Sequence, residues 1–463
     1  MTRLGSATET ARRVLAREAS PVEVIEAALA RVAEVNPQLN AIVTLNPRAL
    51  DDARALERRI ANGEAVGPLA GVPVGIKDVT QVAGLRTTFG SPLYADHVPS
   101  GDAVVVQRLR AAGAIILGKT NTPEFAAGGN TWNDVFGRTR NPWNPAKSAG
   151  GSTGGGAVGL ATGMIGLAEG TDLGGSLRIP ASFCGVVGLR PSPGLVPTHP
   201  SDFVWDTLQV TGPMARSAED IALMLQAIAG PSPLAPLRQP MAGRDFVVAV
   251  RRGPRTGLRV GYCSDIAGIG IDPEIESVCR TAAAGLSASG IAVDLIDLDL
   301  SAGREAFLAL RGHWFSAWMS ERLDRLDQFG VNVRNNTRAG IEGKGLDLGK
   351  AESARGRIWH TFRELFERYD HLLTPTMAVP PFPVEQNYPE TVAGKTMKTY
   401  IDWLAPTFVL SLTGLPVASV PCGLDPGGMP AGLQIVGRPE GEEAVLALAA
   451  RIQDANPIGR PGI

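Results

Sequence analysis

Short apolar segments alternate with amphipathic segments along this chain of 463 residues, and this alternation limits its fold more than any other feature. Residues 71–77, 114–117, 258–262 and 291–296 predict buried strands, because each segment is short and rich in aliphatic side chains. Helices are expected over about 20–36, 47–61, 102–112 and 273–288, with Ser20 and Asp272 as N-caps. Strands separated by helices indicate an α/β fold.

The second half of the chain continues this pattern after an interruption. Residues 230–257 are rich in Pro, Gly and Arg, which predicts a long surface connection. Residues 304–370 are expected to be mainly helical, with a break near 330–349, and the last strands fall near 417–420 and 432–436. Because the alternation resumes after the connection, one large domain is favoured over two.

Composition excludes several classes of function. The formal net charge is −2, so no general basic field would attract nucleic acid, and we expect no nucleic-acid partner. The N-terminal segment 1–20 lacks the apolar core of a signal peptide, and no apolar run approaches the roughly 18 residues that span a membrane. We therefore expect a cytoplasmic protein without membrane contact. The cysteines and five histidines show no metal-ligand spacing, so no metal is expected.

Three separate segments carry side chains suited to catalysis: Lys77 ends the apolar run 71–76, Ser152 lies in the glycine-rich run 150–156, and Ser176 follows two glycines. A serine hydroxyl needs a neighbouring base to become a nucleophile, and no histidine stands in a suitable setting. Lysine can act as that base if burial lowers its pKa. Asp78 would oppose this shift if it faced the amine. Together the segments suggest an amide hydrolase.

The glycines before Ser176 permit backbone conformations that side chains would block, so successive N–H groups could converge on an oxyanion. The alternative interpretation of Gly-Gly-Ser is an ordinary tight turn. Two other motifs fit less well. Residues 150–154 match G-x-S-x-G, but no buried strand precedes Ser152. Residues 113–120 match the P-loop pattern, but an apolar run replaces the polar loop and a helix precedes it.

These segments resemble the amidase signature hydrolases. The resemblance rests on Gly-Val-Pro-Val-Gly-Ile-Lys-Asp (71–78), Gly-Lys-Thr-Asn-Thr-Pro-Glu-Phe (118–125), Gly-Gly-Ser-Thr-Gly-Gly-Gly (150–156) and Thr-Asp-Leu-Gly-Gly-Ser-Leu-Arg-Ile-Pro-Ala (171–181). It covers most of the chain and is strongest over 71–195. It implies one large α/β domain over 1–463, with a mixed β-sheet core flanked by helices on both faces. The catalytic core would span about 65–200, and a variable, mainly helical region at about 300–400 would shape the substrate site.

The resemblance also implies a Ser-cisSer-Lys triad. Ser176 matches the nucleophile, Ser152 the bridging serine after a cis peptide, and Lys77 the terminal base. Thr153 stands where the family usually has a second serine. The implied oxyanion donors are the backbone amides of Leu173, Gly174, Gly175 and Ser176. The side chains of Asp172 and Arg178 are implied to support this loop. No cofactor or metal is implied.

The expected function is hydrolysis of a small-molecule carboxamide to a carboxylate and ammonia or an amine. One alternative is the glutaminase subunit of a tRNA-dependent amidotransferase, although Leu404 stands roughly where that subunit's substrate-binding aspartate would fall. A second alternative is a non-catalytic relative that serves as a binding protein. The sequence leaves the amide and the oligomeric state open, a homodimer included.

Four further side chains carry weaker signals. Cys184 is expected to pack as a small apolar residue. Trp314 and Trp318 lie four residues apart on a predicted helix, so they belong either to the core or to a substrate pocket. His313 has no assigned role.

Overall fold

An eleven-stranded sheet forms the centre of the computed structural model, which describes residues 4–463. The strand order is β1-β3-β2-β6-β8-β7-β14-β15-β11-β9-β10. Strands β3, β2 and β6 are parallel, as are β11, β9 and β10, and the other pairs are antiparallel. The strands are β1 (Ile42–Leu45), β2 (Pro73–Lys77), β3 (Ile115–Thr120), β6 (Leu167–Asp172), β7 (Val187–Arg190), β8 (Val210–Ala215), β9 (Arg259–Tyr262), β10 (Ala292–Leu295), β11 (His371–Pro375), β14 (Val417–Leu424) and β15 (Pro430–Val436).

Helices cover both faces of this sheet. Leu167 and Ala168 are neighbours on β6 but belong to different apolar clusters, because successive strand side chains point to opposite faces. One cluster includes side chains of α1 (Ala7–Leu15), α4 (Val104–Ala111), α7 (Ala218–Ile228), α8 (Phe246–Arg252), α9 (Pro273–Gly285) and α14 (Glu442–Ala455). The other includes α2 (Pro21–Leu39), α3 (Ala49–Ala61), α5 (Gly154–Ala161) and α6 (Arg178–Cys184). The predicted α/β fold with a mixed sheet is confirmed.

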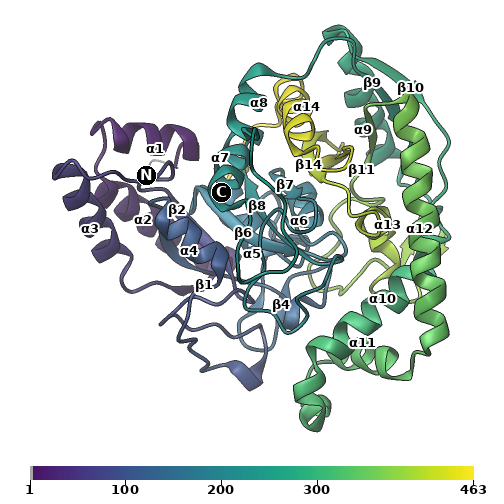
Figure 1. Ribbon diagram of the computed structural model, residues 1–463, viewed down its shortest axis with the longest axis horizontal. Coiled ribbons are helices and arrows are strands. Elements are labelled where there is room, and N and C mark those ends of the chain that lie inside the picture. Colours follow the sequence, from purple (N-terminus) through teal and green to yellow (C-terminus); the bar gives the residue numbers. More distant parts are fainter. Residues whose placement is uncertain (1–3) are drawn as a thin grey trace.

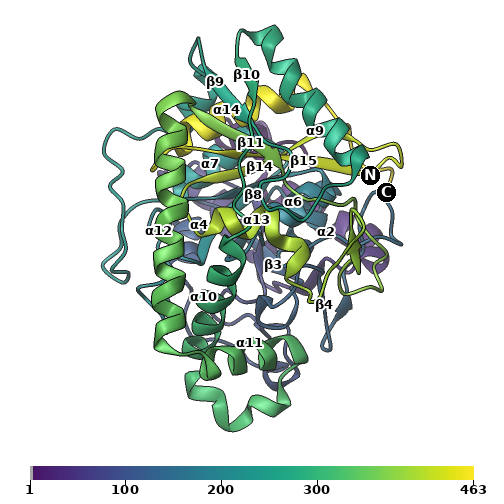
Figure 2. The same cartoon turned by 90° about the vertical axis from the view of Figure 1, so that its right-hand side faces the viewer.

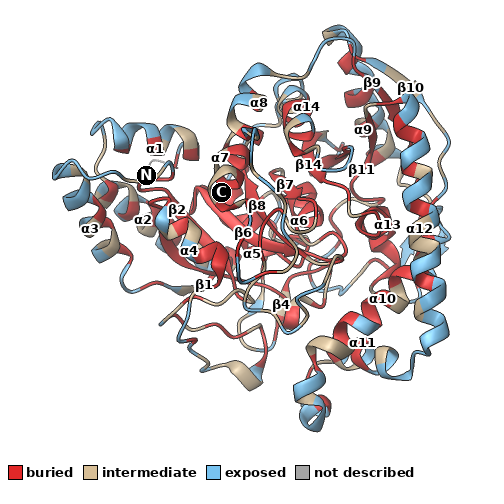
Figure 3. Ribbon diagram, in the orientation of Figure 1, coloured by how far each residue is buried: buried red, intermediate tan, exposed pale blue. Residues whose placement is uncertain are grey.

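A third apolar cluster lies beneath the helices of the region 300–411. These helices are α10 (Gly303–Trp318), α11 (Val331–Glu342), α12 (Gly345–Arg368) and α13 (Ala405–Ser411). Figure 1 shows α10–α12 on the opposite side of the molecule from α1–α3, and Figure 2 shows α12 along one edge. The central strands are buried, whereas the outer helices expose one face (Figure 3). Helices cover most of residues 303–368, as expected for 304–370, whereas residues 371–400 form β11, two short strands (Thr391–Val392 and Lys395–Thr396) and loops.

Three boundary predictions were wrong. Helix α2 does not stop at Asn36 but continues through Pro37 to Leu39, and it ends where Asn40 adopts a left-handed conformation (φ 52°). The connection 230–257 contains α8, whose N-cap Asp245 accepts a hydrogen bond from the Val248 N–H. The break expected over 330–349 is limited to residue 330 and residues 343–344. Packing of α11 against α10 sustains a helix there that the local glycines and polar residues did not indicate.

The parallel pairing of β2 with β6 positions the predicted site. Val74, Gly75 and Ile76 lie opposite Leu167, Ala168 and Glu169, so both strands end at the same edge of the sheet. Lys77 is the last residue of β2, and the loop with Ser176 follows the last residue of β6. The ends of parallel strands are where α/β proteins place their sites.

Candidate active site

Lys77 is completely buried, and its amine contacts two hydroxyl groups. Its Nζ lies 2.7 Å from Ser152 Oγ and 3.0 Å from Thr171 Oγ1. Burial lowers the pKa of Lys77 to about 7, although the negative charges of Glu169 and Asp172 act in the opposite direction. A large fraction of Lys77 is therefore neutral near neutral pH, which is the form that can accept a proton.

Ser152 contacts Lys77, and the residue after it contacts the loop that carries Ser176. Ser152 is fully buried just before α5, and the Gly151–Ser152 peptide bond is cis. The N–H of the next residue, Thr153, donates to the backbone carbonyl of Ser176 at 3.2 Å. The Thr153 hydroxyl is buried and has no hydrogen-bond partner among residues 4–463. The structure thus holds the segments of Ser152 and Ser176 together through their backbones.

Ser176 is half-buried in the loop between β6 and α6. Within the described residues its hydroxyl makes no hydrogen bond, so the direct side-chain contact in the site is between Lys77 and Ser152. Of the four predicted oxyanion donors, the Gly175 N–H already donates to Asp172 Oδ1 at 2.9 Å. The N–H groups of Leu173, Gly174 and Ser176 have no acceptor in the described part of the chain.

The Gly174-Gly175 pair allows the loop to pack closely against α13 and α10. Gly175 has a φ of +121°, and a Cβ at this position would lie 2.2 Å from Thr407 Oγ1. Thr407 Oγ1 in turn donates to the Gly174 carbonyl at 2.7 Å. A Cβ on Gly174 would lie 2.9 Å from the ring of Phe307. Any other residue at either position would displace the loop.

Asp172 anchors the same loop through two buried arginines. Arg178 donates to Asp172 Oδ2 through Nε at 3.0 Å and to Oδ1 through Nη2 at 2.9 Å. Arg190 lies 3.4 Å from Oδ1 and also donates to the Asp172 carbonyl. Burial alone would raise the pKa of Asp172, but the arginines outweigh it and hold this pKa well below its ordinary value. Burial lowers the pKa of Arg190 to about 10.

Sequence reasoning missed Arg190 and the other buried charges near Lys77. Arg190 is the last residue of β7. A cation at the end of an apolar run was the sequence signal that could have indicated a buried charge here. Asp78 does not face Lys77. It lies 3.8 Å from the buried Lys119, and it accepts hydrogen bonds from Thr88. Glu169, in the middle of β6, is also completely buried.

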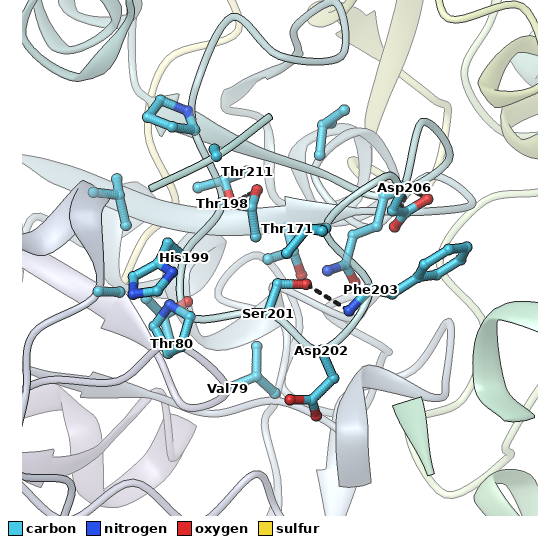
Figure 4. Close-up of a pocket in the computed structure, with 18 of the residues that line it drawn as sticks. Val79, Thr80, Thr171, Thr198, His199, Ser201, Asp202, Phe203, Asp206 and Thr211 are labelled. Carbon is cyan, nitrogen blue, oxygen red and sulfur yellow. Dashed lines mark hydrogen bonds between the residues drawn. The ribbon is translucent and has the colours of Figure 1, made fainter. Parts of the chain in front are cut away.

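A cavity of about 200 Å³ lies beside the site; its lining includes Thr80 and Thr171 but none of Lys77, Ser152 and Ser176. Thr171 lines this cavity and also contacts the amine of Lys77, and Figure 4 shows Thr80, Thr171 and Asp206 around it. Trp314 and Trp318 line it as well, and the Trp314 indole donates to Asp206 Oδ2 at 2.5 Å. Both tryptophans also contact the apolar cluster beneath α10, so the expected core role is present, and a role in a substrate pocket stays a prediction.

The remaining candidates lie away from this chemistry. Cys184 is buried, and burial raises the pKa of its thiol, which is consistent with the expected packing role. His313 is exposed and contacts the ring of Phe203.

Within residues 4–463 no three His, Cys, Asp or Glu side chains lie together in a way that could hold a metal ion. No helix in the same range has the length and apolar character needed to cross a membrane.

The fold and these segments define an amidase signature enzyme. The family model described as Amidase matches residues 23–446, and the chain belongs to this family of amide-hydrolysing enzymes. It is 38% identical to an acylamidase from Rhodococcus erythropolis, over 98% of this chain and 95% of the relative. It is 34% identical to one of the subunits of the glutamyl-tRNA(Gln) amidotransferase of Thermosynechococcus vestitus, over 97% of each chain.

Solved structures show the same relationship. The crystal structure of a bacterial aryl acylamidase of the amidase signature family superposes with a TM-score of 0.92 at 29% identity. The match covers 98% of this chain and 97% of that chain. These similarities support amide hydrolysis and give no support to a non-catalytic relative.

Proposed function

We propose that this amidase cleaves its substrate through an acyl-enzyme on Ser176. Ser152 passes its proton to neutral Lys77 and accepts the proton of Ser176, whose oxygen attacks the amide carbonyl. The proton on Lys77 then returns through Ser152 to the leaving nitrogen as the C–N bond breaks. Water hydrolyses the ester by the same proton route and regenerates Ser176. The 2.7 Å contact between Lys77 Nζ and Ser152 Oγ is the observation that carries this proposal.

The loop before α6 would stabilise the tetrahedral intermediate. We assign the oxyanion to the backbone N–H groups of Leu173, Gly174 and Ser176, which have no acceptor among the described residues. Gly175 contributes its positive φ, because its own N–H is bound to Asp172. Asp172, held by Arg178, would thus fix the direction of the three N–H groups.

The cavity beside Thr171 would hold the substrate's apolar substituent. Its wall includes the aromatic side chains of Phe89, Phe203, Trp314 and Trp318, and a volume of about 200 Å³ suits a small group. The similarity to the aryl acylamidase agrees with this choice. We therefore propose aryl or short apolar amides as the substrate class. The region 300–400 would shape this site through α10.

A glutaminase subunit remains the second candidate, because relatives with 34% identity are named as subunits of glutamyl-tRNA(Gln) amidotransferases. Leu404 argues against it. Leu404 is buried beside Trp403 and Gly129 and offers no charged group to a polar substrate. Glutamine hydrolysis that appears only after addition of partner subunits would favour this candidate. The cytoplasmic location and the homodimer stay predictions.

The test is a panel of anilides, aliphatic amides and glutamine, with release of ammonia or amine as the readout. Ser176→Ala and Lys77→Ala should each lower kcat by at least about 10³-fold on every accepted amide. Ser182→Ala removes a buried serine hydroxyl from helix α6, which follows the loop, and its activity should stay close to that of the parent enzyme. Full activity of the Ser176→Ala enzyme would refute the acyl-enzyme.

A further inference from the structure

Seven charged side chains are buried together around the site, each at most 1% exposed. They are Lys77, Lys119, Arg178, Arg190, Asp78, Glu169 and Asp172. Four are cations and three are carboxylates, so the charges of this group balance when the carboxylates are ionised and Lys77 is neutral. Burial raises the pKa of Asp78 and of Glu169, and the charge of Lys119 opposes both shifts. Burying an unbalanced charge costs several kcal/mol, so this composition favours the base form of Lys77 in the resting enzyme.

Glu169 differs from the other two carboxylates. Asp172 is paired with Arg178 and Arg190, and Asp78 with Lys119. Glu169 forms no ion pair within 4.0 Å among residues 4–463, although its side chain is completely buried. Its hydrogen bonds instead join it to the segment of the reactive lysine.

Two hydrogen bonds fix the position of the Glu169 carboxylate. Oε2 accepts the backbone N–H of Lys77 at 3.2 Å, and Oε1 accepts the hydroxyl of Thr80 at 2.9 Å. The β-sheet register explains this contact, because Glu169 lies opposite Ile76, the residue before Lys77. A carboxylate held in this way acts on the lysine through a medium of low dielectric constant.

We propose that Glu169 is a positioning residue that stabilises the ammonium form of Lys77 at the moment when Lys77 accepts the proton. This inference rests on the proposed role of Lys77 as the base. When Ser176 attacks, its proton moves to Ser152 and the Ser152 proton moves to Lys77. Glu169, which binds the backbone N–H of Lys77 and not its amine, would then stabilise this cation through its charge, whereas the carboxylate of a Ser-His-Asp triad hydrogen-bonds the imidazolium directly.

The charges around Lys77 give the sign of the expected effect. Burial lowers the pKa of Lys77, and Glu169 acts against this more strongly than Asp172 does. Asp172 is largely offset by its two arginines. Lys119 on β3 pairs with Asp78, which follows β2, and its charge also lowers the pKa of Glu169. Removing the charge of Glu169 should therefore make Lys77 a weaker base that loses its proton at lower pH.

The experiment is the pH profile of kcat/KM for the purified Glu169→Gln enzyme on an amide that the parent hydrolyses. The acid limb should move down by about 1 pH unit, and the plateau should fall by up to about tenfold, because a weaker base accepts the proton less readily. Glu169→Asp keeps the charge at a greater distance, so its acid limb should lie between the two. Glu442→Gln removes a completely buried carboxylate of α14 and should leave the acid limb unchanged.

The outcomes separate this inference from the proposed function. If Lys77→Ala is inactive but the acid limb of Glu169→Gln stays where it is in the parent, the role of Glu169 alone is overturned. This holds even if the plateau of Glu169→Gln falls. Full activity of Lys77→Ala would overturn both proposals. If Glu169→Gln does not fold, Glu169→Asp decides the question, because an acid limb identical to that of the parent would overturn the inference.

Discussion

Replacing Lys77 with methionine should inactivate the enzyme and at the same time stabilise it. The side chain is completely buried, and its pKa of about 7 lies about 3.5 units below the ordinary value of 10.5. Each unit corresponds to about 1.4 kcal/mol, so burial of this lysine opposes folding by up to about 5 kcal/mol at pH 7. Methionine has a similar volume and no charge. It would leave the hydroxyls of Ser152 and Thr171 without this hydrogen-bond partner. This loss reduces the expected stabilisation by about 1–3 kcal/mol.

The dependence on pH distinguishes this effect from ordinary repacking. Because the folded-state pKa of Lys77 is lowered, the unfolded chain binds more protons between pH 7 and 10.5, and the stability of the parent rises with pH over that range. The stability advantage of Lys77→Met should therefore shrink by about 1.4 kcal/mol per pH unit between pH 7 and 9.

Urea unfolding of both proteins at pH 7, 8 and 9 measures this difference, with Lys350→Met as the control. Lys350 lies exposed on α12, so its replacement should give the same difference in unfolding free energy at each pH. A stability difference for Lys77→Met that does not change with pH would show that Lys77 does not titrate in this window. The proposed base would then lose its physical support.

Three further predictions concern the loop and the cavity. Gly175→Ala should lower kcat at least about 100-fold, because its Cβ would collide with Thr407 Oγ1 and turn the oxyanion donors away; parental kcat would contradict the assigned geometry. Asp172→Asn should lower the free energy of unfolding by about 3–5 kcal/mol, since it leaves two buried arginines without a carboxylate, and urea unfolding with unchanged stability would refute this. Trp314→Phe keeps a ring but removes the hydrogen bond to Asp206, so KM for anilides should rise about 3- to 30-fold while kcat changes less. An equal change in kcat instead would place Trp314 in the chemical step.

Local patterns predicted the fold class correctly and singled out the three segments that carry Lys77, Ser152 and Ser176, whose catalytic roles came from the family resemblance and stay a proposal. A capping box, a short apolar run or a pair of glycines acts on its immediate neighbours, so its meaning can be read along the chain. The same locality explains the errors. Helix α8 was missed because proline and glycine surround it, and α11 was missed because its packing against α10 lies outside the local pattern.

The contacts that define the site join residues far apart in the sequence, and local patterns carry no information about them. Glu169 accepts a hydrogen bond from the Lys77 backbone, 92 residues away in the sequence. Asp206 accepts one from Trp314, which is 108 residues away. Only the order of the strands, with β2 beside β6, decides that a buried carboxylate lies behind the lysine. The sequence by itself determined which groups are available for catalysis. The tertiary structure decided which of their charges are buried together, because burial and pairing depend on the complete sheet.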